Sequence, residues 1–152
     1  MDIYSKLKEL GLELPPHPGS AGLYKPVKQV GNLLFVSGQV PWLGEGQYIK
    51  GKLGAERTLE EGQEAARVCV KNALSVLHTY LGDLNKIKSV VKILAFIQSA
   101  PGFNEQPKVA NGASKLLVEI YGEERGKGAR SAIGCSELPL NVSVEVEFIF
   151  EV

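Results

Sequence analysis

Apolar and polar residues alternate along several stretches of the chain with the period of two that is typical of β-strands. Residues 27–30 and 33–37 are apolar runs separated by Gly31-Asn32, a two-residue sequence of the kind that closes a hairpin. A turn over residues 43–46 then leads to a short strand near residues 48–50. The first third of the chain therefore predicts a hairpin followed by one short strand.

The second half of the chain carries three more strand patterns. Residues 87–97 are rich in β-branched residues and apolar on both faces at their centre, which predicts a central strand covered on both sides. Residues 129–137 and 142–152 are the last two predicted strands. In the final one, Val142, Val144, Val146, Phe148, Phe150 and Val152 share one face, and Ser143, Glu145, Glu147 and Glu151 share the other. We expect the first face to be buried and the second to be polar.

Three stretches have helical periodicity. Residues 2–11 predict a short amphipathic helix. Thr58 and Glu61 form a capping box that begins a long helix, and Gly82 ends it after Leu81. Its inward stripe is predicted to hold Ala65, Cys69, Ala73, Val76 and Tyr80, flanked by Ala66 and Leu77. A second long helix spans residues 107–121 and faces inward with Val109, Ala113, Leu116, Leu117 and Ile120. Residues 122–128 predict a charged, glycine-rich loop.

This order of elements predicts an α+β fold with a single sheet. Each long helix has one apolar stripe, so both should pack on the same face of that sheet. The strand at residues 87–97 is nevertheless apolar on the opposite face, where the chain has no helix left to cover it. An apolar face of this kind needs another subunit, so we expect an oligomer with Glu145 near the subunit interface.

Composition narrows the range of functions. A chain of 152 residues predicts one domain, 1–152, with residues 1–21 forming an N-terminal helix and a Pro/Gly-rich extension. Lys and Arg together equal Asp and Glu at 17 each, so nucleic acid is not expected to be the main partner. Two cysteines, no metal-ligand spacing and no long apolar run predict a cytoplasmic protein without a disulfide framework, a metal site or a membrane span.

Three segments together resemble the RidA/YjgF family, which is also called endoribonuclease L-PSP-like. The sequence GNLLFVSGQVP at residues 31–41 resembles the family's hairpin strand, which ends in S-G-Q-x-P. The sequence ARS at residues 129–131 opens the penultimate strand, and LPLNVSVEVEFIFEV at residues 138–152 resembles the family's C-terminal L-P…E-x-E signature. The resemblance covers about residues 22–152, and the combination of the three segments is more specific than any one of them.

The resemblance implies a homotrimer with a chorismate-mutase-like fold and a cleft between each pair of subunits. Known members hydrolyse reactive enamine and imine acids to 2-keto acids and ammonia without a cofactor. The family's carboxylate-binding arginine matches Arg130, and its water-handling glutamate matches Glu145. Its loop tyrosine matches Tyr24, its backbone site matches Ser37-Gly38, and its helix asparagine matches Asn111 once a short insertion is allowed.

Some positions depart from the family pattern. Many deaminase members carry a cysteine two residues after the arginine, where this chain has Ala132, and Cys135 is out of register with that position. The N-terminal extension and a longer segment at residues 100–108 also set the chain apart. These differences indicate a divergent subgroup in which imine hydrolysis does not follow from the family alone.

The proposed chemistry needs few groups, and each of them has a structural alternative. The planar fork of Arg130 suits a substrate carboxylate, but this arginine could instead be an ion-pair partner at a subunit seam. Glu145 could position water, or it could simply belong to the polar face of its strand. Tyr24 and Asn111 could be surface residues, Gly38 could serve turn geometry alone, and His78 could be a packing or surface histidine. Cys69 is predicted to lie in the core, and Cys135 could be a reactive thiol on its strand but is also predicted to lie in the core.

Three functions remain open at this stage. The first is hydrolysis of 2-imino acids, and the second is a binding module that holds a small carboxylate metabolite without turnover. Loss of the family cysteine favours the second. The third is an endoribonuclease, which zero net charge and the lack of a paired acid and base for phosphodiesters make less favourable.

Overall fold

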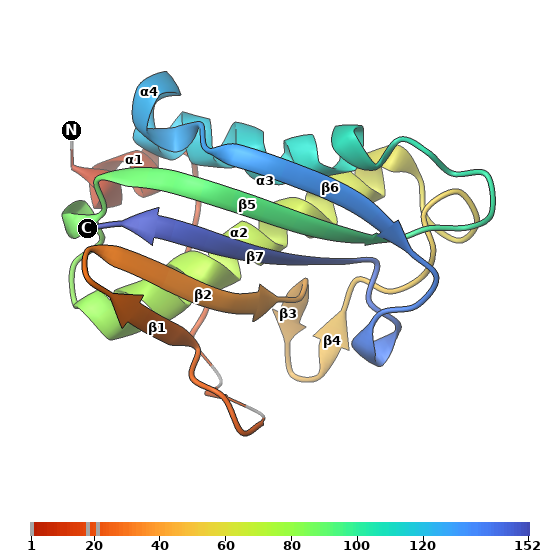
Figure 1. The fold of residues 1–152 in the computed structure, drawn as a ribbon, viewed down its shortest axis with the longest axis horizontal. Helices are drawn as coiled ribbons and strands as arrows, with labels where there is room; N and C mark the ends of the chain where they lie inside the picture. The colour runs from red at the N-terminus through yellow and green to blue at the C-terminus, as the bar shows by residue number, and fades with distance from the viewer. Residues whose placement is uncertain (1, 18, 21) are drawn as a thin grey trace.

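A computed structural model of the chain describes residues 2–17, 19–20 and 22–152. One mixed β-sheet forms the first layer, and two long helices pack together on a single face of it (Figure 1). This is the α+β architecture that the sequence predicts. Met1, Pro18 and Ala21, which belong to the predicted extension, lie outside the described residues.

Across the described residues the main sheet has the strand order β1-β2-β7-β5-β6. These strands are β1 (Val27–Val30), β2 (Leu33–Gln39), β5 (Ser89–Gln98), β6 (Ala129–Cys135) and β7 (Val144–Glu151). Strands β5 and β6 run parallel, whereas the other neighbouring pairs are antiparallel. A separate small hairpin is made by β3 (Trp42–Gly44) and β4 (Gln47–Tyr48). The last strand in sequence therefore lies at the centre of the sheet (Figure 1).

The long helices are α2 (Leu59–Leu81) and α3 (Gln106–Tyr121). Local capping sets the bounds of α2. The side chain of Thr58 accepts a hydrogen bond from the backbone N–H of Glu61, and the Glu61 carboxylate accepts one from the backbone N–H of Thr58. Gly82 ends the helix in the left-handed conformation at φ 74°, which glycine adopts without steric cost. The predicted bounds of α2 are confirmed because both signals are local to the sequence.

Shorter helical turns connect the main elements. They are α1 (Ile3–Glu9), η1 (Leu84–Lys86), α4 (Glu123–Gly126) and η2 (Pro139–Asn141). The prediction of a loop over residues 122–128 is wrong where α4 forms. Arg125 in this turn donates hydrogen bonds to the backbone carbonyls of Lys88 and Ile87, at 2.9 and 2.5 Å. These tertiary contacts hold a helical turn that the local sequence does not indicate.

The core lies between the helices and the side of the sheet that faces them. Helices α2 and α3 approach closely at Gly112, where an added Cβ would lie 2.1 Å from the backbone oxygen of Gln63. The predicted inward residues of both helices are buried except for Tyr80, which is 47% exposed. Its phenol donates to Gln29 of the edge strand β1 at 3.1 Å, because this end of the stripe reaches the sheet edge and not the core.

The alternation predicted for the last strand is confirmed within β7. Its even-numbered residues are buried in the core, and Glu145, Glu147 and Glu151 point to the other face. The prediction for Ser143 is wrong, because regular alternation starts only at Val144. Ser143 is fully buried, and its backbone N–H donates to the carbonyl of Ile49 at 3.0 Å.

The side of the sheet that points away from the helices is referred to below as the open face. Its apolar members include Leu94 and Phe96 of β5, which are half-buried, and Phe35 and Ile133, which are 41% and 46% exposed. Within one chain, β5 is therefore covered on the helix side, as predicted. Cover on its open face stays a prediction that requires a second copy.

Candidate functional site

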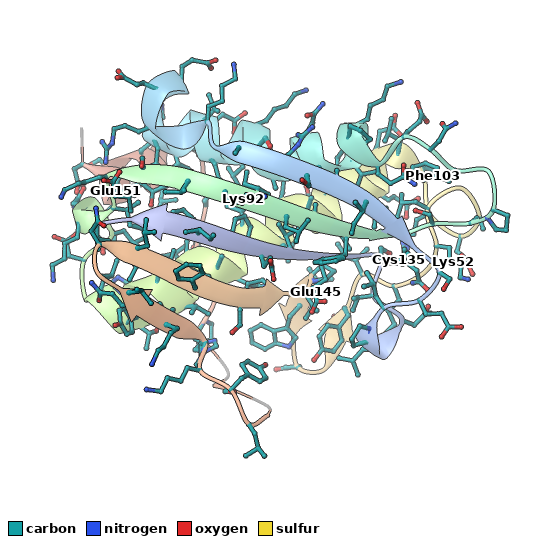
Figure 2. All side chains as sticks on the ribbon, viewed as in Figure 1. Lys52, Lys92, Phe103, Cys135, Glu145 and Glu151 are labelled. Carbon is teal, nitrogen blue, oxygen red and sulfur yellow. The ribbon has the colours of Figure 1, made fainter. Side chains whose placement is uncertain are left out.

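A cavity of about 780 Å³ opens where β2 ends, between the open face, α2 and the N-terminal segment. Four of the residues singled out from the sequence line it: Tyr24, Ser37, Gly38 and Glu145. Figure 2 views the open face and shows Glu145 beside the end of β2. The structure thus gathers most of the predicted site in one place.

A bulge in β2 gives the cavity its polar wall. The pairing of β2 with β7 changes register between Val36 and Gln39, so the intervening Ser37-Gly38 leaves the regular ladder. Ser37 is fixed by its hydroxyl, which donates to the carbonyl of Lys25 at 2.7 Å. A Cβ at Gly38 would lie 3.0 Å from the carboxyl carbon of Glu145, so any larger residue here would force the Glu145 side chain to shift.

Glu145 is the titratable group at the centre of this wall. It is paired with Phe96 on the open face, between the buried Val144 and Val146. Burial, and then repulsion from the carboxylate of Glu147, raise the pKa of Glu145. Among the described residues that line the cavity there is no lysine or arginine to offset these two carboxylates. A carboxyl group with a raised pKa can exchange a proton closer to neutral pH than an ordinary glutamate can.

Tyr24 lies at the rim of the cavity. Its side chain belongs to a loop before β1 and is 55% exposed. The hydroxyl of Ser20 donates to the carbonyl of Tyr24 at 2.9 Å, which ties the loop to itself. A ring in this position can cover a bound molecule, but it is not packed into the core of its own chain.

Arg130 and Asn111 form a second group away from this cavity. Arg130 lies on the edge strand β6, and its Nη1 donates to Asn111 Oδ1 at 2.7 Å and to Ser114 Oγ at 3.1 Å. Among the described residues no carboxylate oxygen lies within 4.0 Å of its guanidinium. The ion-pair alternative for Arg130 therefore has no partner within the described part of this chain.

Arg130 and Glu145 do not share a cleft within a single chain. A pairing of the consecutive strands β6 and β7 could bring the two side chains together, but these strands are not neighbours in the sheet. Strand β5 lies between them. Arg130 is also paired with the buried Ile93 and bonds to α3, whereas Glu145 is paired with Phe96 on the open face. Their roles stay predictions, but the two side chains can meet only between copies.

The two cysteines occupy different surroundings. Cys69 is fully buried under β7, which confirms its predicted place in the core. Cys135 ends β6 and is only half-buried, so its predicted core position is wrong: the strand alternation places it on the same side as Ile133, on the open face that points away from the helices. Burial, and then the charge of Glu145, raise the pKa of the Cys135 thiol, which keeps it protonated.

Sequence reasoning missed four residues that line the same cavity: His17, Trp42, Tyr48 and Asn72. An amide in the middle of the apolar α2 stripe was the available signal for Asn72. The others come from loops and a short hairpin, which only the tertiary fold brings together. His78 instead bonds to Tyr4 on α1, at 2.9 Å between Nδ1 and the phenol oxygen, and does not line this cavity.

Among the described residues, no group of three or more His, Cys, Asp or Glu side chains could hold a metal ion. The longest helices in that part of the chain are also too short or too polar to pass through a lipid bilayer.

Comparisons with known proteins agree over almost the whole chain. A family profile described as "YjgF/chorismate_mutase-like, putative endoribonuclease" matches residues 4–152. Protein TCP17 of Trypanosoma cruzi is 42% identical over 98% of this chain and 93% of its own length. A solved structure of a "putative endoribonuclease" from Shewanella oneidensis matches with a TM-score of 0.94 and 35% identity over 100% of both chains. A 2-iminobutanoate/2-iminopropanoate deaminase of Dermatophagoides farinae is 25% identical over 91% of this chain and 92% of its own.

Proposed function

This chain belongs to the RidA/YjgF family, and from that premise we propose that it hydrolyses reactive 2-imino and enamine acids to 2-keto acids and ammonia. One relative bears the name of such a deaminase. The observation that carries the proposal is the polar wall at Ser37-Gly38 with Glu145 against it, because a water molecule held there would meet a carboxylate of raised pKa.

The proposed site is shared between two copies of the chain. The cavity offers Glu145 but no cation among its described lining residues, whereas Arg130 lies at the free edge of β6 with most of its donors unused. A substrate with one carboxylate and one imine needs Arg130 to bind the carboxylate and Glu145 to act at the imine. A ring of copies in which the β6 edge of one subunit faces the β2 end of the next supplies both, and it also covers the apolar open face.

The proposed reaction requires no group beyond these side chains and water. Arg130 of one copy holds the substrate carboxylate through two parallel hydrogen bonds. Glu145 of the other copy accepts a proton from water as the water oxygen bonds to the imine carbon, and the C=N bond becomes a C–N single bond. Glu145 passes this proton to the nitrogen and then takes the proton of the new hydroxyl group and passes it on in the same way. The C–N bond breaks as the carbonyl of the 2-keto acid forms, so one water is consumed, ammonia leaves and Glu145 returns to its carboxylate form.

A binding module without turnover is a second candidate that one observation favours. Ala132 stands where many deaminases carry a thiol, and the nearby Cys135 is held protonated. The same two-copy cleft could then hold a 2-keto acid for sensing or transport. RNA cleavage is disfavoured, because Glu145 and Glu147 would repel a phosphodiester in a cavity whose described lining has no lysine or arginine.

An imine-decay assay separates the first two functions. An amino-acid oxidase generates the 2-imino acid in situ, and the rate of 2-keto acid formation is followed with and without the protein. A hydrolase should speed imine decay in proportion to its concentration. A protein that binds 2-keto acids in a calorimetric titration but leaves imine decay unchanged is a binding module.

A further inference from the structure

The cavity is much larger than the smallest imino acids require. Its volume of about 780 Å³ falls in the range of sites for drug-sized molecules, roughly 300–1,000 Å³. Besides Glu145, the cavity is lined by His17, Trp42, Tyr48 and Asn72, which come from the N-terminal segment, the β3-β4 hairpin and α2. The part of the cavity defined by those four residues is called the distal pocket below. It is built in part by the extension that sets this chain apart from the family pattern.

Asn72 presents an unused hydrogen-bond acceptor in this pocket. The residue is 8% exposed, and its Nδ2 donates to the carbonyls of Val40 and Trp42 at 2.8 and 3.2 Å. These two bonds fix the amide orientation, because the reverse would set oxygen against two carbonyl oxygens. Its Oδ1 is buried and has no partner among the described residues. A buried acceptor left unpaired costs stability, so its place is best explained by a donor that arrives with a ligand.

His17 adds a second polar atom of the same kind. Its Nε2 is also buried without a partner in the described part of the chain. Burial lowers the pKa of His17, so the ring is neutral near pH 7 and can accept or donate one hydrogen bond at each nitrogen. The extension that carries it is anchored to α2, since the hydroxyl of Ser75 donates to the carbonyl of Pro15.

The remaining walls favour a flat, uncharged group. The rings of Trp42 and Tyr48 and several prolines line the cavity. Such surfaces stack on planar rings. The charged side chains that face the cavity from the described residues are Glu145 and Glu147, which disfavour a second carboxylate on the ligand.

We infer that the distal pocket binds the side chain of the substrate, and that this side chain is a planar aromatic ring with a hydrogen-bond donor at its far edge. The inference rests on the proposed function for the imino-acid end of the molecule. The substrates are then aromatic 2-imino acids whose ring N–H reaches Asn72 Oδ1 or His17 Nε2, and three-carbon imino acids fill only the end near Glu145.

A series of three substrates tests this inference on the full chain. The 2-imino acids are generated from tryptophan, phenylalanine and alanine, and kcat/KM is measured for each. We expect the indole substrate to exceed the phenyl one by roughly 3- to 10-fold, the effect of one neutral hydrogen bond. The phenyl substrate should exceed the methyl one by at least about 10-fold through burial of its ring. Equal or faster hydrolysis of the methyl substrate would overturn the distal pocket while leaving the hydrolase intact.

Variants show whether the named atoms cause the preference. His17→Phe keeps a flat ring but removes both nitrogens, so the preference for indole over phenyl should shrink. His78→Phe makes the same change at the histidine outside the cavity and should alter none of the ratios. Asn72→Ala should abolish the preference, and if its lost bonds to Val40 and Trp42 prevent folding, His17→Phe decides. An unchanged indole preference in His17→Phe and Asn72→Ala overturns the assignment.

Failure of the proposed function is distinguishable from failure of this inference. If the wild type hydrolyses none of the three imines, calorimetric titrations with indole-3-pyruvate, phenylpyruvate and pyruvate replace the rates. The same order of affinities supports the distal pocket in a binding protein. Equal affinities for the three keto acids reject it.

Discussion

At the scale of single residues, the carboxylate of Glu145 departs from the ordinary behaviour of an exposed glutamate. Burial and Glu147 both act against its charged form, and Gly38 leaves it just enough room. The chain therefore holds at this position a group that is poorly solvated when ionised. An ionised group with such poor solvation is typical of functional sites, where a ligand or a second subunit supplies the hydrogen bonds or counter-charge that it lacks.

Substitution of Glu145 tests its proposed part in water activation. Glu145→Gln keeps the shape but removes the basic oxygen, so imine hydrolysis should fall by roughly 10²- to 10⁴-fold while keto-acid affinity survives. Glu151→Gln makes the same change on the open-face side of β7 and should leave the rate unchanged. If Glu145 instead serves as the structural partner of Arg130, melting temperature, assembly and affinity will fall together.

The raised pKa of Glu145 also predicts a pH dependence of stability. Below its ordinary value of 4.5 the group is protonated in both the folded and the unfolded state. As pH rises, the unfolded chain releases the proton first, so the contribution of Glu145 to stability is lost as pH passes through its folded pKa. Glu145→Gln should therefore melt above the wild type at pH 7, by a margin that closes as the pH approaches 4.5. A margin that widens toward acid contradicts the raised pKa.

Arg130 offers a second residue-scale prediction. Arg130→Lys keeps the charge but loses the planar fork, and charge-assisted hydrogen bonds contribute about 1.5–3 kcal/mol. We expect kcat/KM, or keto-acid affinity, to fall by roughly 10- to 150-fold. Arg67→Lys, at the ion pair with Glu119 on the helices, is the matched control and should change neither. Unchanged keto-acid binding by Arg130→Lys would assign this arginine to structure alone.

At the scale of elements, the bounds and buried faces of helices and strands could be predicted from the sequence. Which elements lie side by side could not. The capping box and Gly82 define α2 from the sequence alone, and the alternation of β7 assigns its two faces. The pairing of β6 with β5 cannot be read from either strand, because strand order depends on contacts made far along the chain. Glu145 and Gly38 were identified through the family resemblance. The contribution of His17 and Asn72 to their cavity was not identified, because it depends on contacts between segments far apart in the chain.

The contact between α2 and α3 gives an element-scale prediction. An added methyl at Gly112 would lie 2.1 Å from a backbone oxygen of α2, so the helices must separate. We expect Gly112→Ala to destabilise the fold by about 1–3 kcal/mol through overpacking. At Gly62 the added methyl would meet the end of the Leu53 side chain, at 2.5 Å, which can move. Thermal unfolding should therefore show a smaller loss for Gly62→Ala, and equal losses would contradict the close helix contact.

At the scale of the whole molecule, the open face predicts assembly. We propose that three copies bury it, in an interface that exceeds about 2,000 Å² in total if it is obligate. Light scattering should then give three times the chain mass of 16.4 kDa at micromolar concentration. Ile133→Glu places a charge on the open face and should reduce the mass. Leu43→Glu, on the similarly exposed Leu43 of β3, should not. A mass near 16.4 kDa for the wild type rules out the assembly and the shared site.

The central place of β7 has a consequence for biosynthesis. Strand β2 pairs with β1 on one side. Its other edge pairs with β7 (residues 144–151), which the ribosome synthesises more than a hundred residues later. At about 5–20 residues per second this interval lasts roughly 5 to 20 seconds. During that time the nascent chain exposes an unpaired edge with the apolar Phe35 beside it, a surface that chaperones recognise. Ribosome-bound chains that stop before residue 144 should stay sensitive to protease, and protection should appear in one step once β7 has emerged.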